Sequence, residues 1–238
     1  MSNAGETATE DALRASAKAR FETSVADLLG ISPESDTTWS YNSDQPLLSA
    51  VEALSKGVHR LLVIDVADHN RAYLLSQTDV VRYMSRHLSE ISGWVDNDLA
   101  SLGIGEFRKV VSVSTNETAL TGFHRLLSNE LTALAVVDEA SGAVVDTLSA
   151  ADVRGVDDEN IGILRLPVSE FLKRSGAKHL DIAAITAHSS TALRPTLDQL
   201  TAGKVHRVWI VEGRGQPVGV VALSDVLHVL YRKMVESQ

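Results

Sequence analysis

Three aspartates recur at a constant interval along the chain, each at a place where a ligand could be held. Asp152 lies 73 residues after Asp79, and Asp225 lies 73 residues after Asp152. Each follows an apolar segment and stands where a helix is expected to begin, so its carboxylate has two possible roles. It can cap the helix, or it can accept charge-assisted hydrogen bonds from hydroxyl groups of a ligand. Hydroxyl side chains accompany the three aspartates at Ser76, Ser149 and Ser224.

Two basic pairs, His59-Arg60 and His206-Arg207, occupy matching positions upstream of the first and third aspartates. The planar guanidinium of arginine matches phosphate oxygens and stays charged, and histidine adds a donor whose charge changes near neutral pH. Each pair could instead form salt bridges or a solvated strand end. The occurrence of two pairs at matching positions favours the binding of an anion.

The segments around the aspartates form an internal repeat with the predicted order strand, helix, strand, strand, helix. Apolar runs followed by turn residues predict β-hairpins, whose first strands are at 61–66, 134–137 and 208–211. Amphipathic patterns predict a helix before each hairpin, at 46–56, 118–127 and 193–201. A short strand is expected before each of these helices, at 38–41, 110–113 and 182–186. Short helices are expected to introduce the units at 25–29, 99–102 and 168–172.

The repeat predicts three domains of similar length. Their expected boundaries are residues 21–92, 93–162 and 163–238. Residues 1–20 are rich in Ala, Ser and Glu and have no strong apolar stripe. We therefore expect this segment to be a flexible or marginally helical lead-in.

The composition argues against several classes of function. A formal net charge of −9 disfavours broad contact with nucleic acid, which requires several Lys or Arg against the phosphates. The chain has no cysteine, which excludes disulfides, thiolate metal sites and a cysteine nucleophile. Walker and G-x-S-x-G motifs are absent, and so is histidine spacing typical of zinc sites. We therefore expect a protein that is not an enzyme and binds no metal.

Targeting signals are also absent from the sequence. No apolar run approaches the roughly 18 residues that span a bilayer, and the N-terminus lacks the pattern of a secretory signal. These observations predict a cytoplasmic protein without membrane contact, with the nucleus as an additional location.

Several stretches resemble a known family. They are residues 56–61 (KGVHRL), 102–105 (LGIG), 135–139 (AVVDE), Ser149-x-x-Asp152 and 204–207 (KVHR). The repeat unit that ends in Ser/Thr-x-x-Asp resembles the CBS domain, over almost everything from Val25 onward. In detail the stretches are similar to the gamma regulatory subunit of the AMP-activated (sucrose-nonfermenting type) protein kinase. The resemblance implies an α+β fold of tandem β-α-β-β-α units, two of which pair as a Bateman-type module with one additional repeat.

The resemblance also implies a departure from that family. Its members normally carry four repeats paired two by two, and the three repeats here resemble the second, third and fourth. No room remains before Val25 for a counterpart of the first. Two explanations stay open: the sequence is a truncated piece of a longer protein, or the odd repeat pairs with another chain, which includes a homodimer.

The implied ligand is an adenine nucleotide, AMP, ADP or ATP, bound as a regulatory ligand with no other cofactor required. The aspartates would accept hydrogen bonds from the ribose, and the basic residues would bind the phosphates. Arg82, one turn after Asp79, resembles a basic phosphate contact of the family. The second repeat has Thr132 where the others have histidine. If the second and third repeats pair, His206 and Arg207 would serve a phosphate whose ribose is held by Asp152 and Ser149.

The third repeat is ranked below the second as a site, because Ala222 stands three positions before Asp225 where the other repeats have serine. The leading hypothesis is a nucleotide sensor that acts on a partner, expected to be a kinase complex with catalytic and scaffold subunits. Two alternatives stay open. One is a CBS-fold adaptor that has lost ligand binding, and the other is an allosteric module of an enzyme or transporter.

Overall fold

A computed structural model of the chain describes residues 10–29, 37–88, 90, 93–105, 110–154, 156–175, 182–203 and 205–236. The first nine residues of the expected lead-in and Lys204 lie outside these ranges. Residues Glu10–Phe21 form a helix, α1. No helix among the described residues has both the length and the apolar character needed to cross a membrane.

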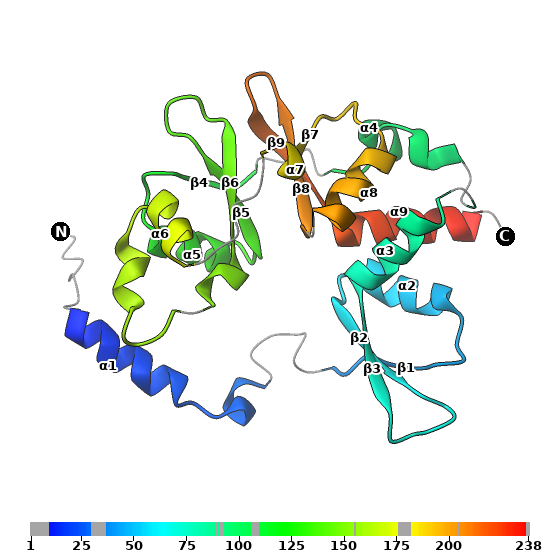
Figure 1. Cartoon of the computed structure of the whole chain (residues 1–238), viewed down its shortest axis with the longest axis horizontal. Helices are drawn as coiled ribbons and strands as arrows, with labels where there is room; N and C mark the ends of the chain where they lie inside the picture. The colour runs from blue at the N-terminus through cyan, green and yellow to red at the C-terminus, as the bar shows by residue number, and fades with distance from the viewer. Residues whose placement is uncertain are drawn as a thin grey trace. The chain divides into compact units, whose positions relative to one another are not determined.

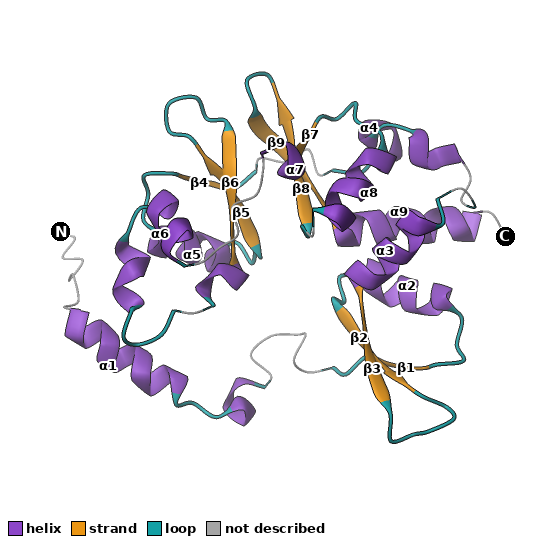
Figure 2. Cartoon of the chain, viewed as in Figure 1, coloured by secondary structure: helices purple, strands orange, loops and turns teal. Residues whose placement is uncertain are grey.

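The described strands form three sheets that repeat one topology, as predicted (Figure 2). In each sheet the first strand runs parallel to the second, and the second pairs with the third as an antiparallel hairpin. The first sheet contains β1 (Ser40–Asn42), β2 (Arg60–Ile64) and β3 (Ala72–Ser76). The second contains β4 (Ser112–Ser114), β5 (Ala133–Val137) and β6 (Val144–Ser149), and the third β7 (Thr186–Ala187), β8 (Arg207–Glu212) and β9 (Gln216–Ala222).

A crossover helix joins the two parallel strands of each sheet, because parallel strands cannot be connected by a tight turn. These helices are α2 (Leu47–Ser55), α5 (Ala119–Ser128) and α8 (Leu193–Ala202). They agree with the predicted helices within two residues at each end. The fold of the chain is thus three CBS-like β-α-β-β-α units in an α+β arrangement.

The sequence prediction was wrong at two elements. Residues 182–186 were expected to form a strand, but α7 (Ile182–Ile185) occupies most of them and leaves a two-residue β7. The hydroxyl of Thr186 donates to the carbonyl of Ile182 at 2.8 Å, which closes this helical turn. Among the described residues of the second repeat, no full closing helix follows the hairpin. The first and third repeats end in α3 (Gln77–Arg86) and α9 (Leu223–Glu236), whereas the second has a single 3-10 turn, η4 (Ala150–Val153).

The short η4 has a reason in the sequence. In the second repeat, Asp152 is followed by Val-Arg-Gly and then by Val156-Asp157-Asp158. In the first and third repeats, Asp79 and Asp225 are followed by mixed apolar and basic residues. Glycine is a poor helix former, and an acidic pair disfavours the C-terminal end of a helix dipole. The second repeat therefore offers no long helix after its hairpin.

The chain divides into two compact units, and each contains residues from two separate stretches. The first unit holds Met1–Leu29 and Val111–Leu180, and the second holds Gly30–Val110 and Asp181–Gln238. The second repeat is therefore in the first unit, and the first and third repeats together form the second unit. The sequence did not predict which repeats share a unit.

The first unit has its own apolar core beneath the sheet of the second repeat. Val113, Leu134 and Leu148 from the strands pack with Phe171 of α6 (Val168–Arg174). The ring of Phe171 meets Phe123 of α5 edge-to-face at 5.5 Å. The N-terminal α1 contacts η5 (Ile161–Arg165), which in turn contacts α5.

In the second unit, helices join the first repeat to the third. Helix α2 packs against α9, and α3 packs against both α8 and α9 (Figure 1). The short helix α4 (Leu99–Leu102) also belongs to this unit, where the N–H of Leu99 donates to the carbonyl of Thr191 at 2.9 Å. The helix α3, which begins beside Asp79, is therefore part of the junction between two repeats.

Candidate functional site

The hairpin register brings the predicted site residues of each repeat to one corner. The residue at the start of the hairpin lies opposite the residue just before the closing helix or turn, so the residues upstream of each hairpin and the aspartate that follows it lie at the same end of the sheet. The opposed pairs are Arg60 with Ser76, Ala133 with Ser149, and Arg207 with Ala222.

In the first repeat, Ser76 and Asp79 form a reciprocal cap at the start of α3. The hydroxyl and the N–H of Ser76 donate to Oδ2 of Asp79 at 2.6 and 3.0 Å, and the N–H of Asp79 donates to Oγ of Ser76 at 3.3 Å. Asp79 therefore lies in the first turn of the helix and Ser76 is the N-cap. The hydrogen bond from the Ser76 hydroxyl holds the pKa of Asp79 below its usual value.

The cap uses Oδ2 of Asp79, whereas Oδ1 lies near the guanidinium of Arg82. Oδ1 of Asp79 lies 3.8 Å from Nη1 of Arg82, and both side chains are roughly half exposed. An exposed ion pair at this distance is weak and easily rearranged. The carboxylate can therefore keep its cap through Oδ2 while Oδ1 accepts a ligand hydroxyl.

The other two repeats keep the same carboxylate position. Oδ2 of Asp152 accepts the N–H and the hydroxyl of Ser149 at 2.6 and 2.9 Å. In the third repeat, Oδ2 of Asp225 accepts the N–H of Ala222 at 2.6 Å. The loss of the serine hydroxyl at Ala222 therefore removes half of the cap but not the carboxylate.

An open depression of about 690 Å³ lies beside this corner in the first repeat. This volume falls within the roughly 300–1,000 Å³ that is typical of small-molecule sites. Its lining combines the basic residues Lys56, His59 and Arg60 with large apolar residues that include Trp39 and Leu74. The lining residues are Thr37, Thr38, Trp39, Lys56, Gly57, Val58, His59, Arg60, Leu61, Leu62 and Leu74.

The structure therefore brings together predicted site residues that belong to the same repeat. The first repeat brings His59, Arg60, Ser76, Asp79 and Arg82 to one corner. The second places Thr132 beside the start of η4, where the N–H of Ala150 donates to its carbonyl at 2.9 Å. The third repeat places His206 beside the start of α9, where the N–H of Leu223 donates to the carbonyl of His206 at 3.3 Å. Ser224 is the next residue of that helix. Asp152 lies in the first unit and Arg207 in the second, so a nucleotide shared between them stays a prediction.

A comparison with known families identifies the repeat. A family model described as CBS domain matches residues 181–232, which form the third repeat. The first and second repeats have the same strand order and the same strand directions as this matched repeat. The chain is a CBS-domain protein.

The CBS-domain protein is distantly similar to gamma regulatory subunits. It is 26% identical over 244 residues to the SNF1-related protein kinase regulatory subunit gamma-like PV42b of Arabidopsis thaliana, covering 87% of this chain and 67% of that protein. It is 28% identical over 196 residues to subunit gamma-3 of the 5'-AMP-activated protein kinase of Bos taurus, covering 80% of this chain. The chain spans only 39% of the length of that gamma-3 subunit.

A solved structure supports the CBS fold. The crystal structure of protein MJ1225 from Methanocaldococcus jannaschii matches with a TM-score of 0.61 at 19% identity. The match covers 82% of this chain and 66% of that chain. At this identity the likeness shows the fold alone.

The sequence did not identify the apolar wall of the depression in the first CBS repeat. Trp39 is 43% exposed and Leu74 is 69% exposed, although both are large apolar side chains. Trp39 lies in a predicted strand, and its exposure depends on which face of that strand the helices cover. A signal was nevertheless present, because an aromatic residue next to the Thr37-Thr38 pair is unusual in a chain with only 5% aromatic residues.

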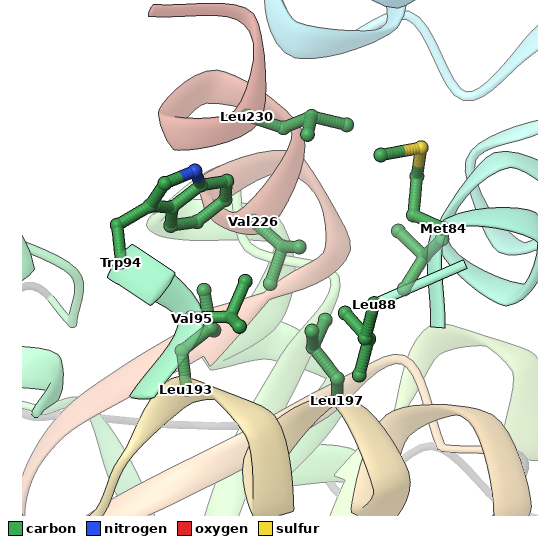
Figure 3. Close-up of a pocket in the computed structure, with 9 residues that line it drawn as sticks. Met84, Leu88, Trp94, Val95, Leu193, Leu197, Val226 and Leu230 are labelled. Carbon is green, nitrogen blue, oxygen red and sulfur yellow. The ribbon is translucent and has the colours of Figure 1, made fainter. Parts of the chain in front are cut away.

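A second cavity of the CBS-domain protein lies between the first and third repeats (Figure 3). Its volume is only about 10 Å³, so it has room for at most one water molecule. Trp94 and Met84 stand at its edges, and α3, α8 and α9 supply the other walls. All nine lining residues are apolar, so this cavity is a packing gap in the junction and not a nucleotide site. Among the described residues, no cluster of His, Asp and Glu could hold a metal ion.

Proposed function

We propose that this CBS-domain protein is a regulatory subunit that binds an adenine nucleotide in its first repeat. The observation that carries the proposal is the depression of about 690 Å³ with cations and apolar side chains on its wall. Arg60 and Lys56 supply positive charge for the phosphates, and Trp39 with Leu62 and Leu74 supplies an apolar surface for the base. No other cofactor is required.

In this proposal, the carboxylate of Asp79 accepts a hydrogen bond from the ribose. Its Oδ2 is held by Ser76, which is the register partner of Arg60. Its Oδ1 faces Arg82 and can accept a hydrogen bond from a ribose hydroxyl. A lone carboxylate would repel a phosphate, but Arg60 and Arg82 offset its charge. The sites at Asp152 and Asp225 are further candidates of the same kind.

The position of α3 offers a route from the nucleotide to the rest of the unit. The helix begins at the proposed ribose site and packs against α8 and α9 of the third repeat. A ligand that binds one arrangement of these helices more tightly than another shifts the population toward that arrangement. The partner that responds to this shift is proposed to be a kinase complex with catalytic and scaffold subunits, because one relative is named as a gamma-like regulatory subunit and another as a gamma subunit of protein kinases.

The proposal is tested by thermal melting of the full chain with AMP, ADP, ATP and S-adenosylmethionine. A ligand at about 100 times its dissociation constant adds roughly 2.7 kcal/mol, which corresponds to a rise of about 5–11 °C for a chain of this size. We expect this rise with at least one adenine nucleotide and its loss in Asp79→Ala. The matched control is Asp98→Ala, which removes a helix-capping aspartate at α4, away from the depression.

The outcome separates the sensor from the adaptor. A rise that survives Asp79→Ala but is lost in Asp152→Ala would move the site to the second repeat. Unchanged melting with all four ligands at millimolar concentration would overturn the sensor. The adaptor is favoured by one observation, since the second repeat has neither the basic pair nor the long closing helix of the other repeats. The kinase partner is tested separately by co-purification of tagged chain with catalytic and scaffold subunits.

A further inference from the structure

The third repeat holds a short helix on the loop between β7 and α8. The first two N–H groups of α4 donate to the carbonyls of Thr191 and Ser189 at 2.9 and 3.1 Å, and the first N–H of α8 donates to the carbonyl of Asn97 at 3.0 Å. Asp98, which precedes α4, forms an antiparallel bridge with Ala192. One extended residue and three backbone hydrogen bonds therefore fasten α4 to this loop.

The second repeat holds α6 with the same set of bonds. The first two N–H groups of α6 donate to the carbonyls of Glu117 and Thr115 at 2.8 and 3.2 Å, and the first N–H of α5 donates to the carbonyl of Leu166 at 3.0 Å. Pro167, which precedes α6, forms the antiparallel bridge with Thr118. In two repeats, the loop between the first strand and the crossover helix is thus a binding place for a short helical segment.

The matching loop of the first repeat joins β1 to α2. Counted from the start of the helix, its corresponding groups are the carbonyls of Ser43 and Gln45 and the N–H of Leu47. None of these three groups forms a hydrogen bond with any residue that the structure describes. Because backbone N–H and C=O groups are strong hydrogen-bonding groups, the loop offers one donor and two acceptors to an incoming segment.

A depression of about 330 Å³ lies beside this loop. Tyr41, Val63 and Tyr73 are register partners across the three strands and line it together with the first turn of α2. The residues that match Val63 are Val136 and Ile210, which are 1% and 0% exposed, whereas Val63 is half-buried and Tyr73 is 46% exposed. The first repeat therefore has space for an apolar side chain where the other two repeats are filled.

Carboxylates surround the loop. Asp44 lies within it and is exposed, and Asp65 directly follows β2, whose last carbonyl accepts the N–H of Ser43 at 2.9 Å. None of the described residues that line the depression is basic, and Arg71 lies over the ring of Tyr73, 5.6 Å from its centroid. A segment with basic side chains is therefore complementary in charge to this loop.

We infer that the β1–α2 loop of the first repeat binds a segment of a partner protein, made of an extended residue followed by an apolar and basic helical turn. The extended residue accepts the N–H of Leu47, and the next two N–H groups donate to the carbonyls of Gln45 and Ser43. An apolar side chain of the turn enters the depression, and its basic side chains face Asp44 and Asp65. These groups are not among those proposed to bind the nucleotide.

Charge favours a partner protein over a second copy of this chain. The helices α4 and α6 already occupy loops of their own. The short helix η1 (Val25–Leu28) would bring Asp27 and has no basic residue in its last turn. A second copy would therefore add a carboxylate to a loop that is already acidic.

The test is the fluorescence anisotropy of a labelled peptide, LPVSEFLKRS, titrated with the full chain. This peptide is the sequence of residues 166–175, which contains α6 and its two basic residues. We expect a dissociation constant on the order of 100 μM. Leu47→Pro removes the N–H donor, whereas Leu47→Ala shortens the side chain and keeps the donor. We expect Leu47→Pro to bind about fivefold more weakly than Leu47→Ala, the usual effect of one backbone hydrogen bond.

Both variants should fold, because proline suits the first position of a helix and Leu47 is 39% exposed; circular dichroism checks this. Asp44→Lys is expected to weaken binding of LPVSEFLKRS and to strengthen binding of the charge-reversed peptide LPVSEFLEES, each by about threefold. Leu127→Ala, at an 80% exposed leucine of α5, is the control and should change neither affinity.

Three results would overturn the proposal. The first is no binding of LPVSEFLKRS up to about 1 mM. The second is equal affinity in Leu47→Pro and Leu47→Ala, which would place the peptide elsewhere, including the loop that α6 occupies. The third is self-association of the chain that Leu47→Pro abolishes in sedimentation equilibrium, which would assign the loop to a second copy.

Discussion

Asp79 binds Ser76 twice through a single oxygen, since Oδ2 accepts both the hydroxyl and the N–H of that serine. The arrangement serves the helix and the proposed site together. The cap fixes the first turn of α3, and the carboxylate is thereby fixed beside the end of β3. The orientation of Oδ1 toward a ligand is therefore set by a contact that lies within four residues of the chain.

Removal of the Ser76 hydroxyl is expected to affect both stability and titration. Ser76→Ala should cost about 0.5–2 kcal/mol, the usual effect of losing an N-cap side chain. The same change should raise the pKa of Asp79 toward its ordinary value of 3.8, because the Ser76 hydroxyl is the largest cause of the lowered pKa. Urea denaturation measures the first effect, and NMR titration of the Asp79 side chain measures the second.

Thr78→Ala is the control for this pair of measurements, because Thr78 has a hydroxyl in the same turn with no described hydrogen bond. A pKa of Asp79 that does not move in Ser76→Ala would contradict the role of the serine.

Acid should destabilise the first unit through Glu117. Arg125 donates to Oε2 of Glu117 at 2.8 Å and to the carbonyl of Ser112 at 2.9 Å, which ties α5 to the strand β4. The hydrogen bond from Arg125 lowers the pKa of Glu117 below 4.5. A lowered folded-state pKa contributes stability above the unfolded value, and this contribution is lost as the pH falls through the folded pKa.

We therefore expect the free energy of unfolding to fall below about pH 4.5, and Glu117→Gln to flatten that part of the profile. The pair is about one third exposed, so its contribution at neutral pH should not exceed about 1 kcal/mol. Glu170→Gln, which breaks an exposed pair with Arg174 on α6, is the comparison. If Glu117→Gln and Glu170→Gln flatten the pH profile of the free energy of unfolding equally, Glu117 contributes no more to acid sensitivity than an exposed ion pair does.

Gly122 is expected to tolerate no side chain, although it lies in the middle of α5. A glycine-to-alanine change in a helix ordinarily gains up to about 1 kcal/mol. Here the added Cβ would overlap Cδ2 of Leu148, which is fully buried and cannot swing into solvent. Overpacking of this kind costs about 1–3 kcal/mol, so Gly122→Ala should destabilise the chain in chemical denaturation.

The double variant Gly122→Ala with Leu148→Val isolates the overlap, because valine has no δ carbon. We expect the double variant to be more stable than the sum of the two single effects predicts. Simple additivity would show that the loss in Gly122→Ala has another origin.

Leu197 should stabilise two repeats at once. It lies on α8 of the third repeat and lines the small cavity together with Val81 and Leu88 of the first repeat. Leu197→Ala should cost about 2–5 kcal/mol. Hydrogen exchange should then show faster exchange at the amides of β2 as well as β8, because the two repeats share the junction.

Leu126→Ala is the matched change in the first unit, where Leu126 belongs to the core of the second repeat. Its faster exchange should centre on β5. If Leu197→Ala leaves β2 protected, the first repeat does not depend on the junction for its stability.

The sequence predicted the hairpins and crossover helices well, because local patterns determine them. The alternation around Leu61 and Leu134 and the turns that follow are visible without tertiary information. The failure at 182–186 has a local cause as well, since Ile-Ala-Ala-Ile suits a helical turn as readily as a strand. The short η4 could have been foreseen from the glycine at position 155.

The junction and the wall of the depression could not be predicted in this way. An apolar stripe on α2 shows that a face is buried but not that α9 covers it. The spacing of the carboxylates and the basic pairs predicts a ligand site, which stays a prediction, and the hairpin register places Arg60 opposite Ser76 and Arg207 opposite Ala222. Trp39 and Leu74 were missed because their role depends on a sheet face that the helices of the repeat leave exposed.

The pairing of the first repeat with the third has a consequence for synthesis of the chain. Helix α2 ends at Ser55 and its partner α9 begins at Leu223, so the ribosome must add about 170 residues between them. At about 5–20 residues per second, the nascent first repeat waits roughly 10–30 s with the packing surface of α2 and α3 unfilled. The second repeat is completed during that interval and finds the N-terminal α1 already outside the ribosome. Chaperone protection, if the chain needs it, is needed while the middle of the protein is being translated.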